Sequence, residues 1–144
     1  MMTSSPCGRA DHDPAWLRMP VLGRSMWPTL RPGDMLLVRL APRTLQSGDI
    51  VVLRAGGTLF VHRFLGYRRC GTGRCLLAKG DGRWAFDPLW PENALLGVVV
   101  AVEREEACLP AGPDNAWQRR ILLWWHRLQG GMYRRLRLLF TLFL

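Results

Sequence analysis

Lysine, cysteine and long apolar runs are all scarce in this chain of 144 residues. Nineteen of its 20 basic residues are arginine, which leaves Lys79 as the one lysine. Four cysteines are too few to build a disulfide-rich miniprotein, and no two of them have the two-residue spacing of a zinc site. No apolar run before Val21 has the length of a signal peptide or membrane anchor, so we expect neither. We also expect no metal and no cofactor.

Acidic residues are absent from residues 117–144, which carry six arginines. The formal net charge of the whole chain is +9, so residues 1–116 carry only +3. A basic excess confined to one segment argues against a nucleic-acid-binding protein, and we expect no nucleic-acid partner. The overall composition, 49% hydrophobic and 22% charged, is that of a globular protein whose length fits one domain.

Short apolar runs separated by turn residues follow one another through the central part of the chain. Gly, Pro and Asp residues punctuate these runs, which are 35–40, 49–54, 58–67, 75–78 and 95–104. Runs of this length and punctuation are typical of antiparallel strands rather than of alternating strands and helices. We therefore predict a mainly β fold, a small coiled antiparallel domain over residues 21–106. Residues 1–20 lack periodicity and are interpreted as a flexible leader.

The basic C-terminal segment has a different pattern. Pro and Gly residues over 107–115 predict a linker, after which apolar residues return at helical spacing over 116–144. Gly130-Gly131 divides this segment, and neither half has the roughly 18–20 uninterrupted apolar residues needed to span a bilayer. We expect an amphipathic helical hairpin on an anionic membrane surface, and packing on the β domain or in an oligomer is the alternative. The expected localisation is cytoplasmic or peripheral on a membrane.

Two cysteines flank a turn-like stretch. Cys70 and Cys75 bracket Gly-Thr-Gly-Arg between two apolar runs, so they could face each other across a hairpin. Unpaired loop cysteines are the simpler interpretation, and the sequence leaves the choice open.

The most distinctive cluster of residues is Gly-Arg-Ser-Met-Trp-Pro-Thr-Leu at 23–30, followed by Arg-Pro-Gly-Asp and an apolar run. A serine after a glycine, with a proline turn behind it, can have its hydroxyl held at a fixed surface position. Neighbouring backbone N–H groups then remain free to bind an oxyanion. Taken alone, however, the same residues also describe an ordinary turn.

A nucleophilic serine needs a base, and the chain has three histidines. His12 lies in the leader and His126 in the basic segment, whereas His62 lies within a predicted strand. A strand histidine that merely hydrogen-bonds a neighbour is the alternative. Asp81 and Asp87, six residues apart in a loop after a predicted strand, are candidates for the acid that orients the imidazole. Aspartates beside Gly and Pro also describe a turn.

In chain order, five boxes resemble the type I signal peptidase family. They are Ser-Met-x-Pro-Thr-Leu, Gly-Asp before a strand, Gly-Asp-Ile-Val-Val, Val-His-Arg, and Lys-Gly-Asp with a second Asp. The resemblance covers about residues 21–104 and implies a mostly antiparallel β fold that is shared with the LexA-type self-cleaving repressors. Bacterial signal peptidases and LexA-type proteins use a Ser/Lys dyad. Here the corresponding strand carries His62 and the lysine sits in a later box, which resembles the archaeal and endoplasmic-reticulum type.

This resemblance implies a serine endopeptidase that cleaves a signal, leader or precursor peptide. The residues that match the catalytic boxes are Gly23, Ser25, Met26, His62, Asp81 and Asp87. By that match Ser25 is the nucleophile, His62 the general base and Asp87 the triad acid. Asp81 is a supporting carboxylate, and the two aspartates can exchange roles. The alternatives are a peptide-binding domain of the same fold without catalysis, and a protein whose basic tail binds membrane or nucleic acid.

Overall fold

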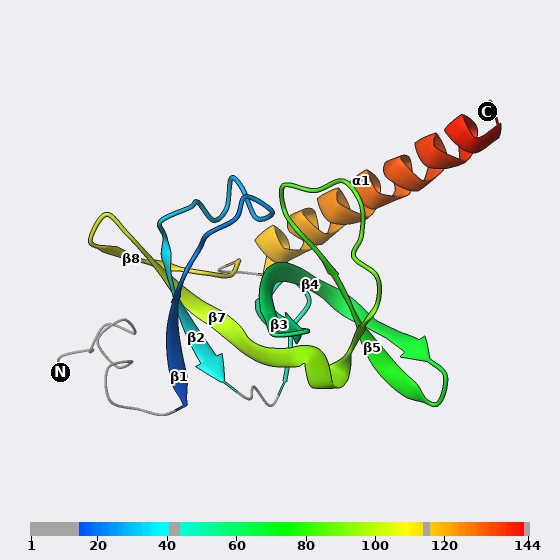
Figure 1. Ribbon diagram of the computed structural model, residues 1–144. Coiled ribbons are helices and arrows are strands. Elements are labelled where there is room, and N and C mark those ends of the chain that lie inside the picture. Colours follow the sequence, from blue (N-terminus) through cyan, green and yellow to red (C-terminus); the bar gives the residue numbers. More distant parts are fainter. Residues whose placement is uncertain (1–14, 41–43, 114–115, 143–144) are drawn as a thin grey trace.

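The computed structural model describes residues 15–40, 44–113 and 116–142, and Figure 1 shows their arrangement. The strands are β1 (Trp16–Pro20), β2 (Met35–Leu40), β3 (Ile50–Ala55), β4 (Thr58–Cys70), β5 (Gly73–Lys79), β6 (Trp90–Pro91), β7 (Leu95–Arg104) and β8 (Ala107–Pro110). The helices are the short 3₁₀ helix η2 (Glu92–Ala94) and α1 (Ala116–Leu142). The strands pair antiparallel in the order β1-β2-β7-β3-β4-β5-β6, and β8 pairs with β7. The predicted fold class, an antiparallel β domain with a C-terminal helical segment, is confirmed.

Strand β3 shows why the apolar runs form strands. Alternate side chains of a strand point to opposite faces of its sheet. Ile50 and Val52 accordingly pack into one core cluster, while Val51 and Leu53 pack into a second cluster on the other face. All four are 0% exposed, so β3 is buried on both sides. The long strand β4 bends where its pairing with β5 shifts, near Gly66, whose φ of +151° favours glycine.

Two strands lie outside the boundaries expected from the sequence. β1 occupies part of the expected leader, and β8 occupies part of the expected linker. Among the described residues each pairs with one neighbour, as an edge strand, and each ends in proline, which sheets accept at an edge. An edge strand has a weak sequence signal because only one side of it is paired. Residues 1–14 of the expected leader lie outside the described residues.

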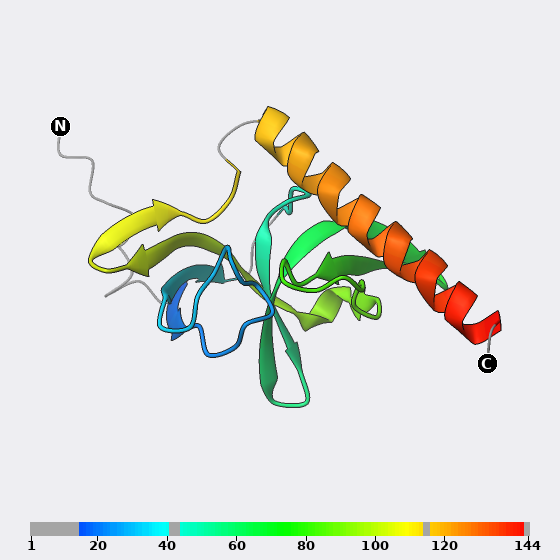
Figure 2. The same ribbon diagram turned by 90° about the horizontal axis from the view of Figure 1, so that it is seen from above.

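The expected helical hairpin is wrong, because α1 is a single helix that continues through Gly130-Gly131. Gly130 is buried, and a Cβ built on it would lie 2.0 Å from Cε2 of Phe86. The glycine therefore serves close packing against that ring rather than a turn. Figures 1 and 2 show α1 beside the sheet, with its C-terminal end projecting past the strands. No helix within the described ranges is long and apolar enough to cross a bilayer.

A disulfide joins Cys70 and Cys75, with 5.8 Å between their Cα atoms. The first of these residues ends β4 and the second lies in β5, which pairs with β4. Of the two possibilities that the sequence left open, the structure contains the disulfide.

Candidate active site

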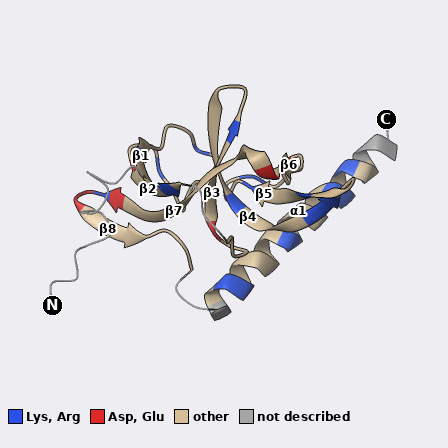
Figure 3. Ribbon diagram, turned by 90° about the horizontal axis from the view of Figure 1, so that it is seen from below, with Lys and Arg blue, Asp and Glu red and all other residues tan. Residues whose placement is uncertain are grey.

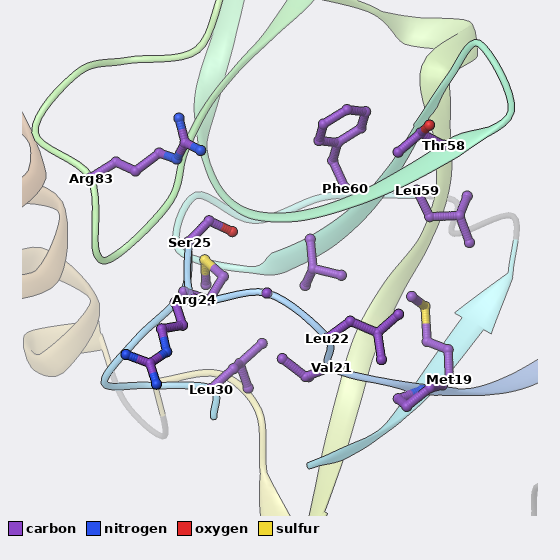
Figure 4. A pocket seen from close by; sticks show the side chains of 14 residues that line it. Met19, Val21, Leu22, Arg24, Ser25, Leu30, Thr58, Leu59, Phe60 and Arg83 are labelled. Carbon is purple, nitrogen blue, oxygen red and sulfur yellow. The ribbon is translucent and has the colours of Figure 1, made fainter. Parts of the chain in front are cut away.

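Ser25 lies in the loop between β1 and β2, and two buried neighbours hold this loop against the sheet. Met26 and Leu30 are 2% and 1% exposed and belong to a core cluster. The N–H of Leu30 donates to the carbonyl of Met26 at 2.9 Å. Met26 thus anchors the chain and leaves Ser25 half-buried, one residue earlier, with its hydroxyl directed into a pocket (Figure 4).

The far end of this loop is fixed by a charged pair. Nε and Nη2 of Arg104 donate to the two carboxylate oxygens of Asp34 at 2.8 and 2.6 Å. The N–H of Arg31 donates to the same carboxylate at 2.8 Å. The hydrogen bond from Arg104, aided by that of Arg31, holds the pKa of Asp34 below its ordinary value, although burial acts in the opposite direction. The Arg-Pro-Gly-Asp turn is therefore fixed by an ionised carboxylate.

A glycine-containing turn after β5 packs against the backbone of the loop that carries Ser25. The N–H of Gly82 donates to the carbonyl oxygen of Ser25 at 2.8 Å. A Cβ on Gly80 would lie 2.4 Å from that same oxygen, and one on Gly82 would lie 2.8 Å from the carbonyl oxygen of Trp27. Such distances leave no room for a side chain. The glycines of the Lys-Gly-Asp-Gly sequence let the two backbones touch.

His62 lies on β4, is 6% exposed, and makes a hydrogen bond from Nδ1 to Oδ2 of Asp87. Nε1 of Trp90 donates to the same oxygen at 3.0 Å, and the N–H of Asp87 donates to the carbonyl of Ala78 at 3.0 Å. These contacts fix the carboxylate. Because an ionised carboxylate only accepts hydrogen bonds, Nδ1 is the donor and Nε2 of the neutral ring is left as a proton acceptor.

The pairing of β4 with β5 brings His62 to the turn that contacts Ser25. Arg63 pairs with Lys79 at the end of that ladder, and His62 and Gly80 are the next residues along the two strands. Gly80 is also the residue against which the backbone of Ser25 packs. The structure thus joins His62 to Asp87 and packs the turn after β5 on the loop that carries Ser25.

Asp81 lies apart from His62 and ties several elements together. It accepts hydrogen bonds from Oγ1 of Thr29 at 2.6 Å and from Nε of Arg63 at 3.1 Å. Its Oδ1 lies 3.1 Å from Nε2 of His126 on α1. Burial favours the neutral acid, but the contacts with His126 and Arg63 outweigh it and hold the pKa of Asp81 well below its usual range. Asp81 therefore supports the loop that carries Ser25 through its hydrogen bond with Thr29.

Lys79, His126 and Gln129 form a buried contact that the sequence did not predict. Lys79 is 0% exposed, and its Nζ donates to Oε1 of Gln129 at 2.9 Å and to the carbonyl of Gly80 at 3.3 Å. The same Nζ lies 3.1 Å from Nδ1 of His126. Burial lowers the pKa of Lys79, although the charges of Asp81 and Asp87 oppose this shift. Helix α1 is therefore docked behind the turn that contacts Ser25.

A pocket of about 580 Å³ opens beside Ser25 (Figure 4). One wall comes from the end of β1 and the loop after it, and the other from the start of β4. Its apolar lining includes Met19, Val21, Leu22, Leu30, Leu59 and Phe60, and Arg24 and Arg83 add positive charge. Gly23 also lines it, but a Cβ there would meet no atom within 4 Å, so packing does not require glycine at that position.

A model of the peptidase S24-like family matches residues 4–78, which is 75 of the 144 residues. The chain belongs to this family. No curated protein shows a significant match to it. The family assignment confirms the resemblance to LexA-type and signal-peptidase-like proteins at that broad level. The matched segment includes Ser25 and His62 and ends before Asp81, Asp87 and α1.

Proposed function

We propose that this S24-like protein is a serine endopeptidase of the signal-peptidase type, with Ser25 as nucleophile and His62 as general base. The observation that carries the proposal is the buried hydrogen bond between Nδ1 of His62 and Asp87, beside the turn that packs on Ser25. A histidine oriented in this way by a carboxylate is the arrangement that activates a serine hydroxyl. A structural strand histidine remains the alternative, and the proposal rests on this pairing together with the turn that connects its strand to Ser25.

The proposed reaction begins when Nε2 of His62 removes the hydroxyl proton of Ser25 as the oxygen attacks a peptide carbonyl. Asp87 stabilises the imidazolium that forms, and His62 then gives its proton to the leaving amine. Among the described residues, the N–H groups of Ser25 and Met26 donate to no backbone carbonyl in the loop. They are available for the developing oxyanion, whose stabilisation contributes roughly 3–4 kcal/mol per donor in comparable enzymes. Water then hydrolyses the acyl-enzyme by the reverse proton path.

Lys79 is the alternative base, since related proteins use a Ser/Lys dyad. In this chain Nζ of Lys79 is engaged with Gln129, His126 and the carbonyl of Gly80. Within the described ranges no hydrogen bond joins Ser25 to Lys79 or to His62. The difference is that Nζ of Lys79 is engaged in these contacts, whereas no hydrogen bond engages Nε2 of His62 among the described residues. The proposal therefore takes His62 as the base and gives Lys79 a part in docking α1.

The substrate is proposed to be an extended peptide. β5 pairs with β4 only from Arg63 onward, so the segment 58–62 has one edge without a described strand, and the edge strand β1 has one as well. Both segments contribute to the walls of the pocket beside Ser25. A peptide added to such an edge forms backbone hydrogen bonds while its alternate side chains enter pockets. The apolar lining favours apolar side chains near the cleaved bond.

The test uses a mixed-sequence peptide library with mass-spectrometric detection of new termini. We expect the wild-type chain to cleave a subset of peptides and Ser25→Ala to cleave none. Ser47→Ala is the matched control, because Ser47 contacts Arg119 through its backbone carbonyl rather than its hydroxyl, and it should cleave as the wild type does. Cleavage retained by Ser25→Ala would refute the proposal.

A further inference from the structure

Helix α1 uses one face to dock on the β domain. On that face His126 is 1% exposed and Gly130 is buried against Phe86. Nη1 of Arg119 donates to the carbonyl of Ser47 at 2.6 Å and lies 3.3 Å from Oδ1 of Asp49. Arg119, His126 and Gly130 are seven and four positions apart, as expected for one side of a helix. Most of the other described side chains of α1 are exposed.

A second face of α1 exposes a stripe of large apolar side chains. Its members are Ile121, Trp125, Leu128, Met132, Leu136 and Leu139, and each is at least 40% exposed. At 3.6 residues per turn these six positions stay on one face, away from His126 and Gly130. Trp124 flanks the stripe and is 62% exposed. Single exposed apolar residues are ordinary, but a continuous stripe of them marks an interaction surface.

Arginines line the same helix, whose own sequence has no acidic residue. Residues 117–144 contain six arginines and no Asp or Glu, and Figure 3 shows α1 carrying only basic charge. Arg120, Arg127, Arg134 and Arg135 have no carboxylate partner in the part of the chain that the structure describes. At the helical repeat Arg120 and Arg135 lie on the flank of the apolar stripe that also carries Trp124. Arg127 and Arg134 lie closer to Gly130, and both line a cavity with Leu65, Leu77 and Phe86 of the β domain. An apolar stripe flanked by arginines and tryptophans is the pattern of a helix lying in a lipid–water interface.

We propose that α1 binds the surface of an anionic lipid bilayer through this stripe and its flanking arginines, while its opposite side stays docked on the β domain. A second copy of the chain is the alternative partner for this face of α1. Two such helices packed together would bring their arginines close to one another, and neither helix has an acidic residue to pair with them. The helix is not apolar enough to cross a bilayer, so it lies along the surface. The inference is independent of the peptidase proposal.

The experiment measures sedimentation of the full chain with vesicles of phosphatidylcholine mixed with phosphatidylglycerol, and with vesicles of phosphatidylcholine alone. We expect binding to the anionic vesicles, with partial release by salt. The variant Arg120→Gln/Arg135→Gln should bind roughly 10- to 30-fold more weakly. The matched control, Arg39→Gln/Arg54→Gln, removes the same charge from exposed positions of the sheet and should bind almost as the wild type does.

The apolar stripe has its own pair of variants. Leu136→Gln/Leu139→Gln should weaken binding roughly tenfold or more, whereas Leu89→Gln/Leu109→Gln, equally exposed but off the helix, should not. Circular dichroism checks that every variant is folded. Three results would overturn the proposal: no binding by the wild type, equal weakening by the helix and sheet variants, or a dimer in sedimentation velocity that is lost on changing Leu136 and Leu139.

Discussion

The docking of α1 on Lys79 yields a prediction for Gln129. Lys79 is completely buried, and Oε1 of Gln129 lies 2.9 Å from its Nζ. The change Gln129→Leu keeps the side chain's approximate size but removes this acceptor. A hydrogen bond to a charged group contributes about 1.5–3 kcal/mol, so we expect the free energy of unfolding to fall by about 2 kcal/mol.

The same change in a Lys79→Met background separates this contact from general damage to the helix. Without the ammonium there is nothing for Oε1 to accept, so Gln129→Leu should then cost close to nothing, which gives a coupling energy of about 2 kcal/mol. Lys79→Met alone removes a charged form that burial makes unfavourable. Urea unfolding of the four full-length chains, followed by circular dichroism and tryptophan fluorescence, measures the cycle. An equal loss in both backgrounds, or no loss in either, would refute the docking contact.

Three further predictions concern packing, catalysis and acid stability. Gly130→Ala should lower the free energy of unfolding by about 1–3 kcal/mol, because the new methyl group would overlap Phe86. Gly131→Ala, where a Cβ would meet nothing within 4 Å, should raise it by up to about 1 kcal/mol. Equal effects of the two changes in denaturant unfolding would contradict the packing. Asp87→Asn should reduce kcat by about 10⁴-fold by leaving His62 in the wrong tautomer, while Asp81→Asn should act mainly on stability. A larger loss of kcat for Asp81→Asn than for Asp87→Asn in a peptide-cleavage assay would assign the orienting role to Asp81. Stability should fall as the pH drops below 3.8, the ordinary pKa of Asp81, because the unfolded chain then binds a proton that the folded carboxylate resists. Asp81→Asn should make the acid-unfolding curve shallower, and an unchanged slope would show that the folded carboxylate is not held ionised.

The strands could be predicted because their signals are local. The apolar run at 49–54 has turn residues on both sides, and it became β3, which is buried on both faces. Ser25, His62 and Asp87 stand in short boxes whose order is itself informative. The roles of Asp81 and Asp87 stayed exchangeable, because the sequence does not show which carboxylate reaches the histidine.

Packing of the helical segment on the β domain was one of the alternatives that the sequence left open, but the contacts that dock α1 could not be predicted, since they join distant residues. Lys79 and Gln129 are 50 positions apart, and no local pattern couples them. Two consecutive glycines have low helix propensity, so Gly130-Gly131 was expected to end a helix. In the structure the ring of Phe86 leaves no room for a side chain at Gly130, so that glycine serves packing. His126 was correctly seen as part of a basic segment, yet it faces Lys79 and Asp81 inside the protein.

The central claim, that Ser25 attacks the carbonyl with His62 as its base, is tested most directly by trapping the acyl-enzyme. The full chain is mixed with a peptide ester identified from its cleavage preferences, quenched in acid during turnover, digested, and analysed by mass spectrometry. The account predicts an added acyl group on the fragment containing Ser25, absent from Ser25→Ala and strongly reduced in His62→Ala. Turnover with no acyl group on that fragment, or with the group on another residue, would contradict it.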